Sequence, residues 1–190
     1  TSPIQFNIGN SYGWYTIINE PLYEIRLSDN VYKVQSGKLL LKNFPATSHP
    51  QSVQAFTINY QPSYSLRISY TTLYASRRAI SHDLFRRSDW VKDNHPTNDA
   101  REALYKPVWA PNQWVSNLFI SKTFQIEANN RKINLRLTSS IRNLFNASIP
   151  SLIFEQSRYD YKNFSLQKFP AKYIYDLGST YTIGLQLSLL

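Results

Sequence analysis

The chain has 190 residues, no cysteine and a formal net charge of +9. Only 17% of its residues are charged, against about 25% in an average soluble domain, and 15% are aromatic, so the composition indicates a protein that forms an interface. The lack of cysteine excludes disulfide scaffolds, thiolate zinc sites and cysteine nucleophiles.

Long segments of alternating apolar and polar residues predict β-strands, because successive side chains of a strand point to opposite faces. In the first segment, Ile4, Phe6 and Ile8 fall on one face. In the last, every second residue from Tyr181 to Leu189 is apolar. We therefore predict an all-β chain of antiparallel strands with about ten residues each, the length of a tilted strand that crosses a bilayer. The six expected strands are 3–19, 51–60, 64–76, 113–127, 131–143 and 177–190.

The segment 113–127 carries two polar residues, Ser116 and Lys122, on its otherwise apolar face. Aromatic residues fall toward the strand ends, where membrane barrels carry interfacial girdles. These aromatic residues are Tyr12, Trp14, Tyr60, Tyr64, Tyr74, Trp114 and Tyr181.

The connections between the expected strands differ strongly in length. Residues 61–63 and 129–130 have the composition of tight turns, whereas 20–50, 77–112 and 144–176 are long. Short turns at one end and long loops at the other are typical of outer-membrane β-barrels, with the loops outside the cell. Both ends of the segment are then expected on the periplasmic side.

Several motifs resemble those of TonB-dependent outer-membrane receptors of the Bacteroidetes group. Residues 143–146 resemble the signature that closes the penultimate strand, and 155–161 with 168–178 resemble the last extracellular loop. Residues 37–46 and 49–51 resemble the loop and strand start that lie further upstream. The motif residues are Asn143, Leu144, Phe145, Asn146, Glu155, Gln156, Arg158, Phe169, Pro170, Tyr175 and Gly178.

The resemblance implies that residues 1–190 form the C-terminal portion of a 22-stranded outer-membrane barrel that lacks the plug and the TonB-binding motif. The implied partners are the remaining strands and the plug of the same barrel, outer-membrane lipid, TonB through the N-terminal part, and a surface lipoprotein or larger complex. The implied function is import of a scarce large solute without catalysis or a cofactor. Since the sequence has no methionine, we expect a processed or partial product.

Three alternatives stay open at this point. In the first, the chain is a receptor-derived structural subunit of a larger outer-membrane complex. In the second, it is an independent eight-stranded barrel in which 23–27 and 38–42 add a hairpin. A basic, aromatic binder of single-stranded nucleic acid ranks last, because the predicted strands have no second layer to cover their apolar face. We therefore expect no nucleic-acid partner.

No catalytic or metal site is expected. The tripeptide 81–83 contains the residue types of a catalytic triad, but neighbours in sequence do not produce triad geometry. The spacing of His49, His82 and His95 matches no ligand pattern, and the acidic residues of 89–99 lack the arrangement of a calcium loop.

Two groups of residues are candidates for ligand binding. Arg67, Arg136 and Arg142 share the polar face of their strands, where they would contact a plug or line the route of an anionic solute. The long loops carry a second group, which would contact a ligand or pack together as a cap. This group comprises Arg86, Arg87, Trp90, Tyr105 and Trp109.

Overall fold

The computed structural model describes residues 3–26, 33–46, 48–93, 105–128, 131–158 and 167–189. The all-β prediction is confirmed, since antiparallel strands dominate and the helical elements η1 and α1 are short. Among the residues described, no helix is both long and apolar enough to span a membrane. The elements are β1 (Ile4–Tyr12), β2 (Leu22–Arg26), β3 (Lys33–Lys38), β4 (Ser52–Ser63), β5 (Leu66–Ser76), η1 (Phe85–Arg87), α1 (Asp89–Asp93), β6 (Gln113–Ala128), β7 (Arg131–Arg142), β8 (Pro150–Phe154), β9 (Lys172–Tyr175) and β10 (Thr180–Leu189).

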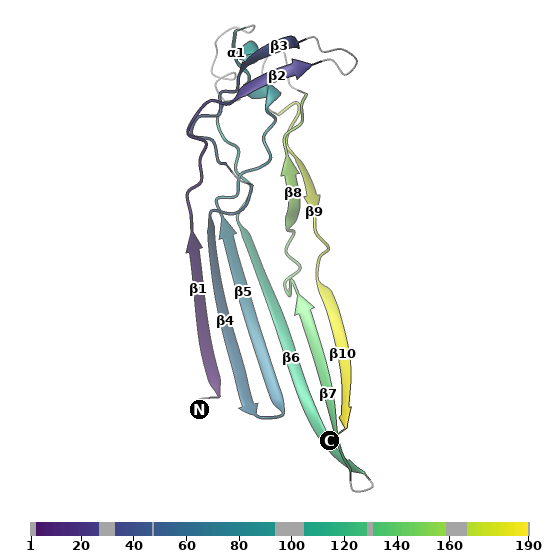
Figure 1. The fold of residues 1–190 in the computed structure, drawn as a ribbon. Helices are drawn as coiled ribbons and strands as arrows, with labels where there is room; N and C mark the ends of the chain where they lie inside the picture. The colour runs from purple at the N-terminus through teal and green to yellow at the C-terminus, as the bar shows by residue number, and fades with distance from the viewer. Residues whose placement is uncertain are drawn as a thin grey trace.

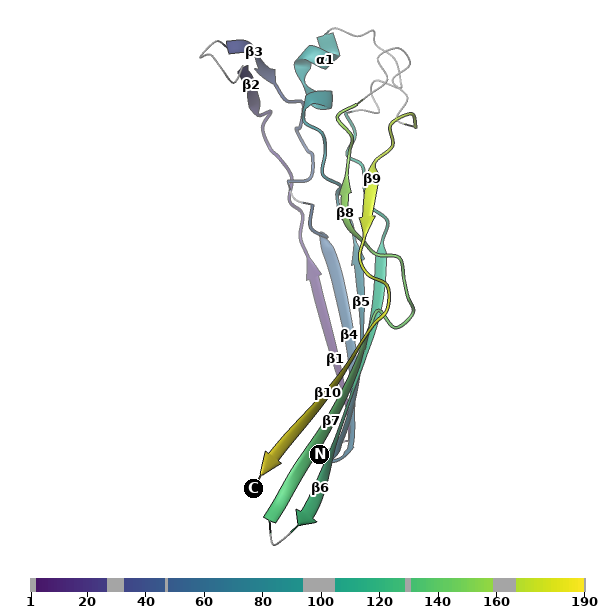
Figure 2. The same cartoon turned by 90° about the vertical axis from the view of Figure 1, so that its right-hand side faces the viewer.

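Six strands form one antiparallel sheet in the order β1-β4-β5-β6-β7-β10 (Figure 1). The start of β1, the β4–β5 turn, the end of β6, the start of β7 and the end of β10 lie at one end of this sheet. The three long connections rise from the other end, and we call their described residues within 13–51, 77–112 and 143–179 the cap. Figure 2 shows that the sheet twists strongly, so that β7 and β10 run at an angle to β1, β4 and β5.

The strand register collects most of the large apolar residues of the six strands on one face of the sheet, while Leu73, Val115 and Phe119 lie on the other face. Directly paired residues of antiparallel strands point to the same side, so each cross-strand row belongs to one face. One apolar row consists of Phe6, Ile58, Tyr70, Leu118, Ile141 and Tyr181. The adjacent row on the opposite face consists of Gln5, Asn59, Ser69, Phe119, Ser140 and Thr182. We call these two sides the apolar face and the polar face.

The first strand is shorter than the expected 3–19. Gly13 N–H donates to Gln51 O at 2.8 Å, and this hydrogen bond, next to the start of β4, ends the pairing of the two segments. Beyond it, Ile17 N–H donates to Phe44 O and Asn43 N–H donates to Ile17 O, both at 2.8 Å. The predicted strand was too long because the backbone groups after Tyr12 form their hydrogen bonds within the cap rather than in the sheet.

The predicted turn at 61–63 is wrong. Strand β4 continues to Ser63, and the turn lies at Tyr64 and Ser65. A register shift between Tyr60 and Ser63 accommodates Pro62, which has no N–H to contribute to a ladder. The other predicted turn, at 129–130, lies outside the described residues.

The long connections contain regular structure that the sequence analysis did not predict as part of the loops. Region 77–112 contains η1 and α1, and 144–176 contains the pair β8–β9. Strands β2 and β3 form a hairpin near the one considered at 23–27 and 38–42, but they pair with each other in a separate two-stranded sheet. The hairpin therefore does not add strands to the six-stranded sheet.

Among the described residues, six of the buried apolar side chains belong to two small clusters in the cap. Leu39, Leu41 and Phe44 pack together with Ile17 and Tyr23. The second cluster joins residues from the second and third long connections. Its members are Ile80, Ala110 and Ile153, with Val108 and Ala171 packed against them.

Candidate membrane-facing and lumen-facing surfaces

In the part of the chain that the structure describes, the large side chains of the apolar face are partly or strongly exposed. Exposure is greatest on the edge strands, with 64% of Phe6, 81% of Ile8 and 77% of Ile183 accessible, and lower on the inner strands, where 37% of Ile120 is accessible. A soluble protein rarely leaves so large a continuous apolar area in water. The face therefore has the character of a surface that contacts lipid or another apolar partner.

The polar residue Ser116 on this face is buried and hydrogen-bonded. Tyr70 Oη donates to Ser116 Oγ at 3.0 Å, and Ser116 Oγ donates to Thr72 Oγ1 at 3.1 Å. Only 1% of Ser116 is exposed. Because the three hydroxyl groups bond to one another, the face does not present an unpaired polar group at this point.

The second polar exception, Lys122, reaches away from the centre of the apolar face. Its Nζ donates to Ser65 Oγ at 3.1 Å, in the turn between β4 and β5. Its ammonium also lies 5.9 Å from the centroid of the Phe124 ring. A lysine that extends its charge to the sheet end while its stem covers an apolar surface is typical of the boundary of a bilayer.

Aromatic residues lie near both ends of the strands. Tyr74 and Trp114 pack at the cap end, with ring centroids 5.6 Å apart. Near them, the Arg77 guanidinium lies 3.9 Å from the centroid of the Trp14 ring. The sequence analysis missed Arg77, because its backbone φ of 56° redirects the chain after β5 and strand alternation does not predict such a residue.

The three arginines predicted on the polar face separate into two places. Arg67 and Arg136 line one hollow of about 290 Å³ near the β4–β5 turn, together with Ser121, Thr123 and Thr138. The Arg136 Nε–H donates to Thr123 Oγ1 at 3.4 Å.

Arg142 lines a different hollow, of about 350 Å³, at the cap end of the sheet. Asp176 lines the same hollow and gives it a carboxylate. The structure therefore brings Arg67 and Arg136 together and places Arg142 in a separate environment.

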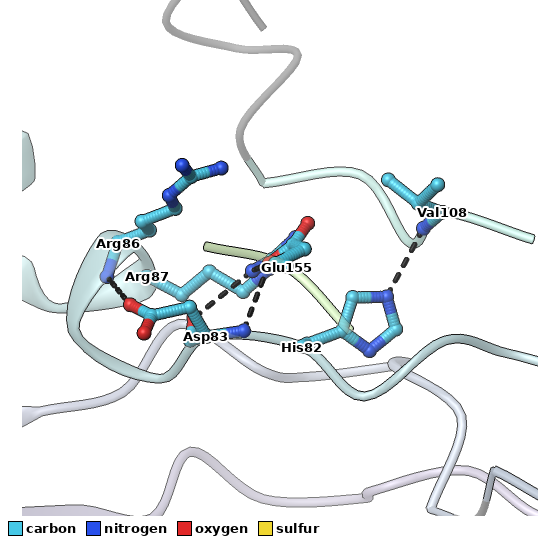
Figure 3. A network of polar contacts seen from close by, with 6 residues as sticks. All are labelled: His82, Asp83, Arg86, Arg87, Val108 and Glu155. Carbon is cyan, nitrogen blue, oxygen red and sulfur yellow. Dashed lines mark hydrogen bonds and ion pairs between the residues drawn. The ribbon is translucent and has the colours of Figure 1, made fainter. Parts of the chain in front are cut away.

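The cap is held by a buried ion pair between the second and third long connections (Figure 3). Arg87 pairs with both carboxylate oxygens of Glu155, and its Nη2 donates to Oε1 at 2.7 Å. Asp83 N–H donates to Glu155 Oε2 at 2.8 Å, and Arg86 N–H donates to Asp83 Oδ1 at 3.0 Å. Burial alone would raise the pKa of Glu155, but the hydrogen bond and charge of Arg87 hold it below its usual value.

His82 lies beside this ion pair and serves a structural role. Its Nε2 accepts a hydrogen bond from Val108 N–H at 3.0 Å, and its ring packs edge-on against Phe44 at 5.2 Å. Burial and the nearby charge of Arg87 lower the pKa of His82 to about 4. The imidazole is therefore neutral near pH 7 and works as a hydrogen-bond acceptor.

The other discarded sites have ordinary roles where the structure describes them. Asp89 accepts hydrogen bonds from Lys38 N–H at 2.8 Å and Tyr23 Oη at 3.3 Å, which connects α1 to the β2–β3 hairpin. The described residues contain no group of three metal-ligating side chains. His95 lies outside the described residues.

The loop candidates Arg86 and Arg87 lie inside the cap. Both are buried, with 2% and 1% of their surface exposed, and so neither presents its side chain to a ligand from solution. Trp90 packs against Phe85 with ring centroids 5.6 Å apart, and the Trp109 ring lies 5.8 Å from the Arg77 guanidinium. Tyr105 is half-buried. These residues belong to the packing of the cap.

The motif residues 143–146 form the junction between the sheet and the cap. Asn143 and Asn146 both have a φ of 53°, which ends β7. The Asn143 side chain bonds to both backbone groups of Ala147, at 2.8 and 2.9 Å, and Asn146 Oδ1 accepts from Ser179 N–H at 3.0 Å. Ser179 Oγ in turn donates to Asn143 O at 2.6 Å. The junction thus joins the end of β7 to the start of β10.

Gly178 is required beside this junction. A Cβ atom at this position would collide with Asn146 Oδ1, which bonds to the next backbone N–H. The remaining motif residues Leu144 and Phe145 form the turn after β7, and Phe145 is exposed. The space taken by the Asn146 side chain therefore explains why a glycine, which has no Cβ atom, occupies position 178.

The later motif residues connect the two sides of the third long connection. Gln156 Nε2 donates to Pro170 O at 2.8 Å, and Tyr175 stacks on Tyr173 with centroids 6.1 Å apart. Lys168 Nζ lies 5.9 Å from the Phe169 ring centroid. Arg158 is exposed.

The sequence analysis also missed Arg78, which connects three segments of the cap. Its guanidinium donates to Ser48 O at 3.1 Å, Pro150 O at 2.8 Å and Ser151 O at 2.6 Å. These acceptors are backbone carbonyls, so no residue type in the sequence signals them.

No family model, curated protein or solved structure matches this chain. Its function must therefore be inferred from the sheet, its two faces and the cap. The arrangement is a sheet with one mainly apolar and one mainly polar side, and folded loops extend from one of its ends.

Proposed function

We propose that this chain is part of the barrel wall of a TonB-dependent outer-membrane receptor that imports a scarce large solute. The single observation that carries the proposal is the register of the sheet, which collects most of the large apolar residues of six strands on one face. The polar face would then border the lumen, and the cap would lie outside the cell. The receptor family, the 22 strands and the coupling to TonB are proposed from the resemblance of the sequence motifs.

The two polar exceptions on the apolar face support lipid as its neighbour. Ser116 is enclosed by hydroxyl partners, and Lys122 extends to the turn end. An unpaired polar group in hydrocarbon costs several kcal/mol, so a lipid-facing surface needs such arrangements. A surface adapted to water would not need them.

The open edges of the sheet favour a larger barrel over an independent one. In the part of the chain that the structure describes, β1 and β10 each pair on one side only. Edge strands in a bilayer must find partners for their backbone groups. Their second neighbours are therefore proposed to be further strands of the same barrel. The eight-stranded alternative gains no support, because β2 and β3 pair apart from the sheet.

A receptor-derived structural subunit of a larger outer-membrane complex would use the same wall. Uptake of solute distinguishes the two functions, since a structural subunit would assemble without importing anything. The proposed receptor is expected to need TonB for uptake, and its assembly is expected to be independent of TonB.

Arginine substitutions at adjacent positions of β10 test which face contacts lipid. Leu185 lies on the apolar face opposite Leu137, and Gln186 lies on the polar face opposite Arg136. Arginine at the lipid face near the midplane costs about 2–4 kcal/mol, whereas like charges opposed across strands cost at most about 1 kcal/mol. We expect Leu185→Arg to reduce the amount of assembled receptor in purified outer membranes well below that of Gln186→Arg.

A second pair on the neighbouring strand provides the control. Leu135→Arg changes the apolar face and Thr138→Arg the polar face of β7. The same difference in assembled receptor is expected there. Equal assembly for both members of each pair would contradict the proposal that the apolar face contacts lipid.

A further inference from the structure

We infer that Arg77 binds the negatively charged phosphate of a lipid in the outer leaflet, at the border between the apolar face and the cap. The inference rests on the proposed function, because it assumes that lipid surrounds the apolar face and that the cap lies outside the cell. It adds a specific binding site and the chemical class of its occupant, a lipid with an anionic phosphate headgroup.

The backbone conformation of Arg77 brings its side chain to the border of the apolar face. With regular alternation, residue 77 would follow Leu73 and Ala75 onto the polar face. Its φ of 56° redirects the chain, and its guanidinium lies 3.9 Å from the centroid of the Trp14 ring. Trp14 continues the alternation of Tyr12 on the apolar face, and 58% of Trp14 is exposed. The cation therefore lies where this face meets the cap.

The distance of Arg77 from the turn end of the sheet matches the height of a bilayer. Strand β5 has 11 residues from Leu66, which pairs with Lys122, and Arg77 follows its last residue. At about 3.3 Å per residue and a tilt of about 40°, Arg77 is about 28 Å from the level of Lys122 along the membrane normal. The apolar band of a membrane barrel is about 25 Å tall. The two cations thus lie at opposite boundaries of the band, where lipid headgroups begin.

Arg77 has no acceptor in the part of the chain that the structure describes. Its Nε is buried without a hydrogen-bond partner, and no described carboxylate or carbonyl accepts a bond from its guanidinium. The adjacent Arg78 differs, because its guanidinium donates to three backbone carbonyls. The described strands also carry no acidic residue on the apolar face. A cation at this boundary therefore needs an anionic acceptor from outside these residues.

A phosphate group fits the exposed edge of this guanidinium. Trp14 lies against it at 3.9 Å, and the Trp109 ring lies 5.8 Å away. The rings attract the positive charge, but they do not accept hydrogen bonds as oxygens do. A guanidinium that stacks on a ring keeps its N–H donors at its edge, where two parallel bonds to phosphate oxygens form. Phosphate lies between the headgroup and the acyl chains of a lipid, which is the level that Arg77 occupies.

The cross-strand row nearest to this site favours a lipid over a soluble anion. It consists of Asn10, Gln54, Tyr74 and Trp114, and both amide side chains are exposed. Tyr74 and Trp114 pack together with ring centroids 5.6 Å apart. Amides can bond to the hydroxyl groups of a headgroup, while the rings and the apolar residues beyond them contact acyl chains. A soluble anion would use none of this apolar surface.

Site-specific cross-linking of the intact receptor tests the inference. The receptor is purified from outer membranes and reconstituted in phosphatidylcholine vesicles that contain a small fraction of synthetic lipid A, either with one phosphate or without it. A benzoylphenylalanine replaces Tyr12, which is exposed on the apolar face at the cap end. We expect it to capture the phosphorylated lipid about 10-fold more than the dephosphorylated lipid, a preference of ~1.4 kcal/mol.

Substitutions of Arg77 assign this preference to its charge. Arg77→Asn removes the charge and keeps a residue type that tolerates positive φ, so we expect the preference to disappear. Arg77→Lys is expected to retain most of it. Lys122→Gln, which removes the cation at the other boundary of the same face, is the matched control and should leave the preference at Tyr12 unchanged. The comparison of the two lipids in the unmodified receptor stands even if an Arg77 variant does not assemble.

Three results would overturn the inference. They are equal capture of both lipids by the unmodified receptor, an unchanged preference in Arg77→Asn, and loss of the preference on adding millimolar inorganic phosphate. The last result would assign the site to a soluble anion. All three are measured on receptor recovered from the outer membrane, so they differ from failure of the proposed function, in which the chain does not reach that membrane.

Discussion

The cap buries its apolar side chains, whereas the sheet exposes them along one face. In the described residues, every buried apolar side chain lies in the cap and none lies in the six strands. The sheet instead exposes isoleucine, leucine and aromatic side chains along one face. The buried apolar residues of the cap are Leu39, Leu41, Phe44, Ala79, Ile80, Val91, Ala110 and Ile153.

This difference agrees with the proposed function, in which the cap contacts water and the apolar face of the sheet contacts lipid. The cap encloses small apolar clusters and a buried ion pair, as a water-soluble fold does. In the proposed barrel, an apolar environment would stabilise the exposed face of the sheet. Changes to buried groups should therefore destabilise the cap, whereas the sheet should respond to the face that a substitution alters.

The largest expected effect is on the ion pair of the cap. Glu155→Gln leaves Arg87 buried without its counter-charge, which typically costs about 3–5 kcal/mol. We expect the cap of the assembled protein to become protease-sensitive at a much lower urea concentration. The measurement is the fraction of intact chain after a short protease pulse across a urea series.

A second ion pair gives a matched control for this prediction. Glu127 and Lys132 lie 3.8 Å apart with both side chains exposed, near the turn end of the sheet. Exposed pairs contribute about 0–1 kcal/mol, so Glu127→Gln should leave the protease profile nearly unchanged. If the two variants behaved alike, the cap would not depend on its buried pair.

Local patterns predicted the sheet because a single-layered sheet repeats one rule in every strand. The alternation in 131–143 and 177–190 corresponds to β7 and β10, since each strand has one apolar and one polar side. The same rule gave a wrong strand end after Tyr12. Trp14 and Ile18 continue the alternating pattern, but the backbone there pairs with the cap. Periodicity describes side-chain environment and does not show which segment the backbone bonds to.

The cap could not be predicted in the same way, because its contacts join residues far apart in sequence. Arg87 and Glu155 are separated by 68 positions, and no spacing connects them. The motif at 143–146 was recognised by resemblance, whereas its physical basis, two asparagines with positive φ, required the structure. Arg67 and Arg136 shared a predicted face, but their common hollow depends on the register.

A change of pH should weaken the cap more than the sheet. The pKa of His82 is lowered from its ordinary value of 6.5 to about 4, so the unfolded cap binds a proton more readily than the folded one. The stability due to neutral His82 is therefore complete above about pH 6.5 and is lost as the pH falls toward 4. We expect the urea midpoint for protease cleavage of the cap to be lower at pH 5 than at pH 7.5.

A variant that cannot titrate isolates this contribution. In His82→Gln, the side-chain oxygen can still accept the hydrogen bond from Val108 N–H. The difference between pH 7.5 and pH 5 should shrink in this variant. The lowered pKa of Glu155 affects stability only in more acidic solution, so it does not contribute between these two values. An unchanged pH difference in the variant would assign the effect to another group.

The smallest expected effect concerns the junction that couples the two regions. Asn146 has a φ of 53° and accepts a hydrogen bond from Ser179 N–H at 3.0 Å. Asn146→Gly removes only the hydrogen bond, at a cost of about 1 kcal/mol, because glycine adopts positive φ freely. Asn146→Ala also places in the left-handed region a residue without the polar side chain that lets asparagine adopt it, which adds about 1–2 kcal/mol.

Comparison of these two variants separates backbone strain from the hydrogen bond. We expect the urea midpoint of the cap to fall slightly for Asn146→Gly and further for Asn146→Ala, while the amount of assembled sheet stays the same. The reason is that β7 pairs with β10 along ten positions and does not depend on the residue that ends it. A loss of assembled sheet in the alanine variant would mean that the junction sets the register of β10, and the two regions would then fold as one cooperative unit.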